Sequence, residues 1–172
     1  IRGYLVEAGF DEVINYTLVP EQSKKAPILV NALSSDRSNL REALWPSLYR
    51  SLEKNAPWRE VVGSDQVRLF EIGTVFGERE RDHLVIGLAG KNIKADSLDE
   101  VVKGLGEKIG DKLSALEISA GSNLPTGESV YIGEFDLTST KSKFKDADYV
   151  KDLIPGRSSR NFFRAYSQYP AV

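Results

Sequence analysis

The feature that most constrains the fold is a proline at the start of an amphipathic pattern in the first third of the chain. Pro46 has no backbone N–H and a fixed φ, so it suits the first turn of a helix and would break a helix further along. Leu48 and Leu52 share one face of that helix. Asn55 and Pro57 close it, because a proline disfavours helical backbone in the residue before it. The sequence therefore predicts a helix from Pro46 to Asn55 that docks through a leucine-rich face.

Two apolar segments follow, and a charged segment separates them. Side chains in residues 67–76 alternate between two faces, which predicts a half-buried strand. Residues 83–90 are apolar nearly throughout, so we expect this second strand to be covered on both faces. The polar segment 78–82 between them predicts an antiparallel hairpin. Gly87 and Gly90 indicate close backbone approach or an early end of the strand, and not a phosphate-binding loop.

The other predicted elements are helices and strands in mixed order. Residues 1–8 predict an amphipathic helix that ends at Gly9, and a second helix runs from a capping box at Ser97 to Ile109. Four further strands are predicted: residues 12–19, 27–33, 113–120 and 128–137. This order predicts an α+β fold, with a mixed and mainly antiparallel sheet flanked by helices. At 172 residues we expect a single domain, residues 1–172.

The composition excludes several kinds of site. The chain has no cysteine, which excludes disulfides, thiolate metal sites and cysteine nucleophiles. Its net charge of −2 and pI of 5.6 argue against a surface dedicated to polyanions, although local basic patches are compatible with them. No apolar run approaches the ~20 residues that a membrane span needs, and no signal peptide is visible. We expect a cytoplasmic location and no membrane partner.

Few side chains could perform acid–base or metal chemistry. His83, the single histidine, stands at the entrance of a strand beside charged residues, so we expect it at the surface. No Ser–His–carboxylate spacing surrounds it, and one histidine makes no metal site. Glu71 has apolar neighbours in its strand, and an ion pair with Arg41 or Arg68 is favoured over acid–base catalysis. We therefore expect no catalytic, cofactor-binding or metal-binding residue.

The pattern "LR…L.P.L…L..N" followed by "LFEIG.VF" resembles the core domain of phenylalanyl-tRNA synthetase β subunits. The residues that carry this motif are Leu40, Arg41, Leu44, Pro46, Leu48, Asn55, Phe70, Glu71 and Gly73. The helix–"GF.EV"–strand order at the start is a second point of resemblance. Two positions depart from the family pattern, since Asn31-Ala32 stands where Asn-Pro is usual and Glu42 where a small hydroxyl residue is usual.

The resemblance implies a class II aminoacyl-tRNA synthetase-like domain that has lost catalysis. It implies a role in subunit assembly and tRNA placement during the ligation of phenylalanine to tRNA by a heterotetramer. The implied partners are the catalytic α subunit and tRNA, and ATP and magnesium belong to the holoenzyme only. The first helix resembles the dimerisation motif of the class, so its candidate interface residues are Tyr4, Leu5, Ala8 and Phe10.

Active class II enzymes hold ATP with a pair of arginines, so the presence or absence of this pair tests whether catalysis has been lost. The resemblance places the first near residues 74–77, and only Arg79 and Arg81 follow, on the hairpin tip. The second should close a glycine-rich strand, whereas Gly156 and Arg157 lie in a polar loop. Two fixed guanidinium groups neutralise charge as pyrophosphate leaves. A chain without them is expected neither to bind ATP nor to activate phenylalanine.

The chain turns basic and aromatic from Lys141 onward. Residues 141–172 hold seven Lys and Arg against three Asp, with phenylalanine and tyrosine interleaved. Cations that hold phosphates beside rings that stack on bases are typical of RNA contact, and the candidates are Arg157, Arg160 and Arg164. The interpretation we favour is a solvated connector to a domain absent from this chain.

Two alternatives belong to other classes of function. A degenerate but active class II ligase requires arginines that converge on a sheet face near Glu71. A tRNA- or RNA-binding module centred on residues 141–164 requires salt-dependent tRNA affinity. The chain begins inside a helical pattern and without methionine, which favours a piece of a longer polypeptide. As an isolated fragment it is expected to be a monomer or a self-associating dimer.

Overall fold

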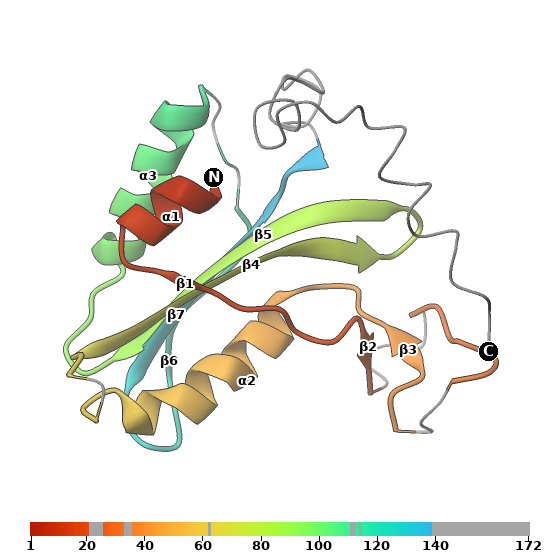
Figure 1. The fold of residues 1–172 in the computed structure, drawn as a ribbon, viewed down its shortest axis with the longest axis horizontal. Coiled ribbons are helices and arrows are strands. Elements are labelled where there is room, and N and C mark those ends of the chain that lie inside the picture. Colours follow the sequence, from red (N-terminus) through yellow and green to blue (C-terminus); the bar gives the residue numbers. More distant parts are fainter. Residues whose placement is uncertain (21–25, 33–35, 62, 111–112, 114, 139–172) are drawn as a thin grey trace, which may run out of the picture. The chain divides into compact units, whose positions relative to one another are not determined.

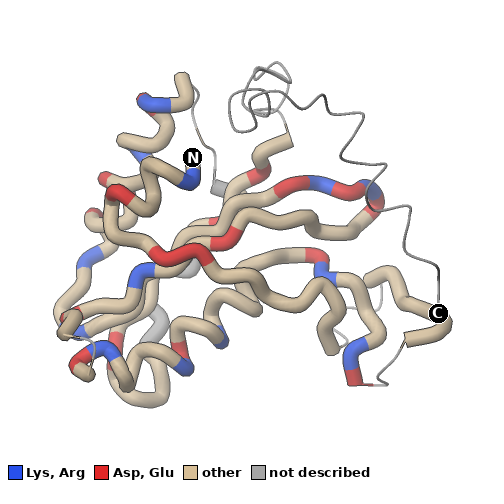
Figure 2. Tube along the Cα trace, viewed as in Figure 1, with Lys and Arg blue, Asp and Glu red and all other residues tan. Residues whose placement is uncertain are grey.

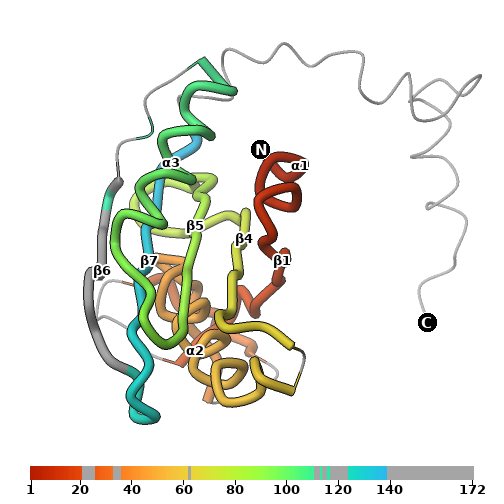
Figure 3. Tube along the Cα trace, turned by 90° about the vertical axis from the view of Figure 1, so that its left-hand side faces the viewer, coloured from red at the N-terminus to blue at the C-terminus, as the bar shows by residue number. Residues whose placement is uncertain are grey.

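The computed structural model describes residues 1–20, 26–32, 36–61, 63–110, 113 and 115–138. Its centre is a five-stranded sheet in the order β1-β4-β5-β7-β6, which Figure 3 shows edge to edge. The strands are β1 (Asp11–Glu12), β4 (Gln66–Phe76), β5 (Glu80–Gly90), β6 (Ala115–Asn123) and β7 (Ser129–Asp136). Every neighbouring pair is antiparallel except β1 with β4, which is parallel. The predicted α+β fold with a mainly antiparallel sheet is confirmed.

The predicted hairpin is the longest ladder of the sheet. β4 and β5 pair from Gln66 with Gly90 to Phe76 with Glu80, and His83 to Gly90 are all buried, as predicted for β5. The prediction that β4 is half-buried is wrong at its centre. Leu69, Phe70 and Glu71 are buried in succession, because helices cover both faces of the sheet.

Different helices cover the two faces (Figure 1). α2 (Trp45–Asn55) and the short helix η1 (Ala56–Trp58) pack on one face, which we call the α2 face. α1 (Arg2–Glu7) and α3 (Asp96–Ile109) pack on the opposite face. On the α2 face, a Cβ on Gly87 would lie 2.7 Å from Leu52 and 3.0 Å from Leu48, so leucine side chains approach Gly87 closely, and not another backbone segment as predicted.

Two of the predicted strands are not formed as expected. The segment 12–19 contains only β1 and β2 (Leu18–Val19), because the N–H of Asn15 donates to the Glu71 carboxylate at 3.3 Å instead of continuing the ladder. β2 pairs with β3 (Asn39–Leu40) in a separate two-stranded sheet. The prediction of a central strand over 27–33 is also wrong. Its described residues make only an isolated bridge from Ile28 to Asn39, and their side chains are largely exposed.

The helix ends show which local signals held. Pro46 lies in the first turn of α2, which begins one residue before it. Gly9 and Gly110 follow α1 and α3 with φ angles of 82° and 68°, the left-handed conformation that glycine adopts readily. The capping box at Ser97 is wrong: α3 starts at Asp96 and no side chain caps it. The preceding backbone is already helical, so Ser97 lies inside the first turn.

Candidate functional site

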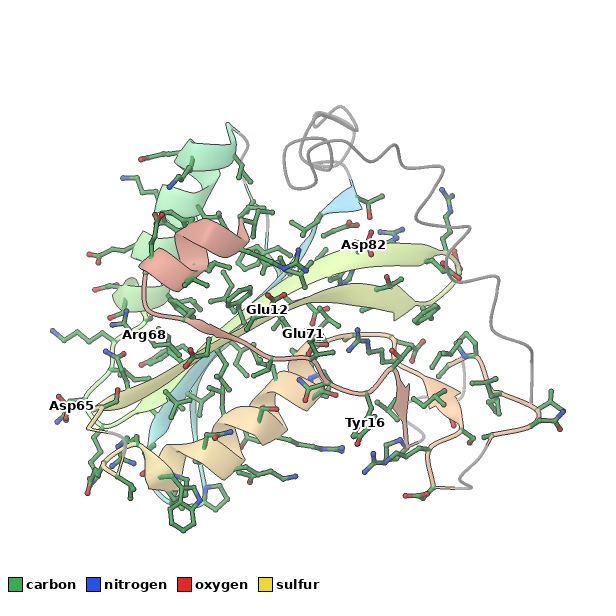
Figure 4. All side chains as sticks on the ribbon, in the orientation of Figure 1. Glu12, Tyr16, Asp65, Arg68, Glu71 and Asp82 are labelled. Atoms are coloured by element: carbon green, nitrogen blue, oxygen red, sulfur yellow. The ribbon has the colours of Figure 1, made fainter. Side chains whose placement is uncertain are left out.

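An ion pair is buried on the α2 face of β4. The Arg41 Nη1 lies 2.6 Å from Oε1 of Glu71, and the two side chains are 6% and 2% exposed. Arg41 follows β3 directly, and its Nε donates to the carbonyl of Thr74 at 3.0 Å. Figure 4 shows Glu71 between β4 and the segment that follows β1. Of the two partners proposed for Glu71, the structure selects Arg41. Separating such a pair would leave a buried charge unpaired.

Two neighbours complete this Arg41–Glu71 pair. Nδ2 of Asn15 donates to Oε2 of Glu71 at 2.7 Å, so both carboxylate oxygens have partners. A Cβ on Gly73 would overlap with Nη2 of Arg41, so glycine is required for the guanidinium to fit. Asn15 was not among the functional residues predicted from the sequence. A polar amide in a run of β-branched and aromatic residues, where asparagine is unfavourable, was the available signal.

A second carboxylate, Glu134 of β7, lies on the same face at the N-terminus of α2. It accepts hydrogen bonds from the N–H groups of Leu44 at 3.0 Å and Trp45 at 2.9 Å. A negative charge at this end of a helix is stabilising, and it serves as the cap that α2 otherwise lacks. Nδ1 of His83 lies 2.6 Å from Oε1 of Glu134. The surface position predicted for His83 is therefore wrong, since it is 7% exposed.

Three arginines beside the sheet have partners within the described residues. Arg41 is paired, and Arg68 donates to the Ala8 carbonyl at 2.9 Å. Arg81 pairs with Asp136 at 3.1 Å, and Arg79 is exposed near the hairpin tip. Figure 2 shows acidic and basic positions alternating along this end of the hairpin. Gly156 and Arg157, which do not match the second ATP-binding position of active class II enzymes, lie outside the described residues.

Two leucines of α2 and the leucine at its N-cap occupy the centre of the same face. Leu44, Leu48 and Leu52 are fully buried against β4, β5 and β7. Burying each leucine is worth about 1.5–3 kcal/mol, so this packing is a principal part of the core. Within the described ranges, no three His, Cys, Asp or Glu side chains are grouped as a metal site would need. In the same part of the chain, no helix has the length and hydropathy to cross a bilayer.

The remaining predicted residues occupy three kinds of position. Of the interface candidates, Leu5 and Phe10 lie in the core and offer no exposed side chain, whereas Tyr4 and Ala8 are partly exposed. In the motif, Leu40 is partly buried, Phe70 is fully buried, and Asn55 is exposed and donates to the Ser51 carbonyl. The RNA-contact candidates lie outside the described residues: Arg157, Arg160 and Arg164.

Solved aminoacyl-tRNA synthetases share this architecture. A pyrrolysyl tRNA synthetase from Desulfitobacterium hafniense matches with a TM-score of 0.56 and 16% identity, over 92% of this chain and 68% of that chain. The Giardia lamblia prolyl-tRNA synthetase, solved with prolyl-adenylate, matches with a TM-score of 0.57 and 9% identity, over 81% and 43%. The chain therefore has the fold of the class II aminoacyl-tRNA synthetases.

Within this class, the chain belongs to the family of the phenylalanyl tRNA synthetase beta chain CLM domain, whose model matches residues 1–160. The phenylalanine–tRNA ligase beta subunit of Bacillus subtilis is 30% identical over 139 residues, which are 68% of this chain and 17% of that protein. The Deinococcus radiodurans protein is 35% identical over 91 residues, 47% of this chain and 10% of that protein. The beta subunit from Pseudomonas putida is matched over 12% of its length, so the chain spans a small part of these proteins.

Proposed function

We propose that this chain is the core domain of a phenylalanine–tRNA ligase β subunit and that it acts as a scaffold without catalysis of its own. The observation that carries this proposal is the state of the α2 face. Its centre is filled by leucines of α2, and the guanidinium of Arg41 buried there is neutralised by Glu71. Phosphoryl chemistry needs cationic groups that are held open towards a triphosphate.

The geometry supports loss of the nucleotide clamp in a second way. Arg79 and Arg81 follow β4 closely, and they stand at the end of a hairpin that continues directly into β5. Arg81 is bound to Asp136 of the next strand. A clamp on a nucleotide would need these side chains folded back over the sheet, where α2 already packs. ATP and magnesium would then be bound by the catalytic α subunit of the assembled enzyme.

Assembly with the α subunit is the role we assign to the start of the chain. The outer edge of β1 is unpaired within the described residues. Ile14 just beyond β1 is 91% exposed, and Val6 on α1 is 59% exposed. Exposed apolar side chains beside an open strand edge favour a protein partner. The proposal therefore shifts the contact from Leu5 and Phe10, which are buried, to Val6 and Ile14. The complex is proposed to be a cytoplasmic heterotetramer that positions tRNA.

The test is assembly of the complete β subunit with its α subunit. Ile14→Asp places a charge at the proposed interface, and we expect it to lower the yield of the complex in sedimentation and the rate of Phe-tRNA formation together. Val61→Asp is the control, because Val61 is 78% exposed and lies in the segment between η1 and β4, outside α1 and β1. Equal assembly of the Ile14→Asp variant and wild type would contradict the proposed interface.

A further inference from the structure

A polar cleft lies between α2 and the segment that joins β1 to β2. Its volume is about 260 Å³, and it opens to solvent on the side of the domain away from α1 and α3. The residues that concern its chemistry are Asn15, Tyr16, Arg37, Ser47, Arg50 and Lys54. Figure 4 shows Tyr16 on the segment between β1 and β2, beyond the first turn of α2. This cleft is separate from the buried Arg41–Glu71 pair, although the two share Asn15.

The floor of the cleft is held by hydrogen bonds to the buried network. Ser51 Oγ donates to Oδ1 of Asn15 at 3.1 Å, and Asn15 Nδ2 donates to Glu71 at 2.7 Å. Asn15 is therefore fixed on both sides by groups that are themselves packed. These hydrogen bonds hold the backbone that carries the cations of the rim in one conformation. A preformed site of this kind lowers the entropic cost of binding a ligand.

Among the described residues, the rim of the cleft carries three cations and one acid. Arg50 and Lys54 are four residues apart on α2, so they project from the same helix face, where like charges repel. Within the described part of the chain, neither forms an ion pair within 4 Å, although Glu53 is nearby in sequence. The third cation, Arg37, is 4.0 Å from the carboxylate of Asp36. The balance of charge in the cleft therefore favours an anionic ligand.

An exposed aromatic ring adjoins these cations. The guanidinium of Arg37 lies 4.7 Å from the centroid of the Tyr16 ring, and Tyr16 is 73% exposed. A ring and a cation in contact form a surface on which a nucleobase can stack. Backbone-tracking cations beside an aromatic platform are the elements of single-stranded nucleic acid sites. A compact anion would use the cations alone and leave the ring without a role.

We propose that this cleft binds single-stranded RNA, with Arg37, Arg50 and Lys54 on its phosphates and Tyr16 stacked on an unpaired base. The inference deepens the proposed role in tRNA placement and rests on it for the identity of the RNA. The site differs from the basic segment 141–172, where the sequence analysis placed its RNA-contact candidates. It provides RNA contact from the folded domain itself.

The test is fluorescence anisotropy of the complete chain with a labelled single-stranded 12-mer RNA across a salt series, without any α subunit. Three phosphate contacts predict a slope of about −2 in log affinity against log salt, which is a loss of roughly 15-fold between 50 and 200 mM. Arg50→Ala with Lys54→Ala should reduce the slope to about −0.7. Tyr16→Leu should weaken binding at least about fivefold and leave the slope unchanged.

Two control variants separate this site from general charge effects. Lys94→Ala with Lys103→Ala removes the same charge from exposed positions at and before α3, and should leave binding as in the wild type. Trp58→Leu removes another exposed ring and should also have no effect. All the substituted side chains are exposed, so each variant is expected to unfold at the same temperature as the wild type. Thermal unfolding of every variant checks this.

Four results of the RNA titration would overturn the proposal. RNA affinity could fall equally in the α3 control, or it could be unchanged in the cleft variants. It could fall only when Arg157, Arg160 and Arg164 are changed, or equimolar ATP could displace the RNA. Cleft variants that weaken α-subunit association and not RNA binding would identify a protein interface and would also overturn it. Failure of the Ile14→Asp test would reject the proposed assembly and leave the RNA titration unaffected, so the two failures are distinguishable.

Discussion

The two faces of the central sheet are built from different chemistry. The face under α1 and α3 is apolar at its centre, where Phe70, Ile86 and Phe135 are buried. The α2 face combines leucines with two buried carboxylates, Glu71 and Glu134. In the strand register both lie opposite Val85, one on each side of it, so the charges form a row across the sheet.

Residues capable of chemistry do not by themselves make a site. Glu71 is neutralised by Arg41 and an asparagine, and Glu134 holds the N-terminus of α2 and contacts His83. Both of these carboxylates are committed to structural partners, and the helix that Glu134 caps covers the sheet. The same groups that could have bound a substrate therefore hold α2 against the sheet.

The largest expected effect comes from breaking the buried pair. Glu71→Ala leaves Arg41 as an unpaired buried cation, and the free energy of unfolding should fall by about 3–5 kcal/mol. Urea denaturation measures this. The double variant Arg41→Met, Glu71→Leu removes both charges and should lie within about 1 kcal/mol of wild type. A loss below 1 kcal/mol for Glu71→Ala alone would show that the guanidinium reaches water.

A methyl group at Gly87 tests how closely α2 packs on the sheet. Gly87→Ala places a carbon 2.7 Å from a fully buried leucine, Leu52, and should lower the unfolding free energy by about 1–3 kcal/mol through overpacking. Gly3→Ala is the matched control, because Gly3 lies within α1 and nothing stands within 4 Å of the added carbon. It should be neutral or stabilising by up to about 1 kcal/mol. Equal changes in unfolding free energy for the two variants would mean that α2 does not pack closely against Gly87.

Removing the charge at the start of α2 should have a smaller effect. Glu134→Gln keeps one acceptor oxygen and loses the negative charge at the helix N-terminus, for an expected loss of up to about 2 kcal/mol. Hydrogen exchange should show the first turn of α2 opening more often, with no change in α3. Uniform loss of protection in both helices would argue that Glu134 acts on the whole core and not through its capping bonds.

The smallest effect concerns pH and the ion pair that joins η1 to the β6–β7 turn. Hydrogen bonding from the Thr126 hydroxyl and pairing with Arg59 at 2.5 Å hold the pKa of Glu128 below its ordinary value of 4.5, although burial opposes this. Because the pKa is lower in the folded state, the pair stabilises fully above about pH 4.5, and this stability is lost as pH falls through the folded-state pKa. In Glu128→Gln, the thermal midpoint should fall less steeply below pH 4.5. An unchanged pH profile would contradict this.

Local chemistry made the helix at Pro46, the β4–β5 hairpin and the glycine helix ends predictable. These depend on backbone restrictions within a few residues, such as the missing N–H of proline and the left-handed φ of glycine. A glycine in an apolar strand predicted a close approach at Gly87, but not that leucine side chains of α2 would make it. The Glu71 pair was predictable as one of two options, since a carboxylate among apolar neighbours needs a cation.

The rest depended on contacts between distant segments. Asn15 diverts the chain from a strand because Glu71, 56 residues later, accepts its N–H. His83 is buried because Glu134, 51 residues later, lies beside it. The cap of α2 comes from β7 and not from a residue before the helix. No local pattern contains these partners, and only the strand register brings them together.

The measurement that most directly tests the closed α2 face is calorimetric titration of the complete chain with ATP and magnesium. No saturable heat is expected, because the Arg41 guanidinium is bound to Glu71 and the leucines of α2 fill the space above the sheet. The Glu71→Ala variant should also show none, since freeing Arg41 does not remove α2. Saturable ATP binding by the wild-type chain, lost on substitution of Arg41, would contradict the account.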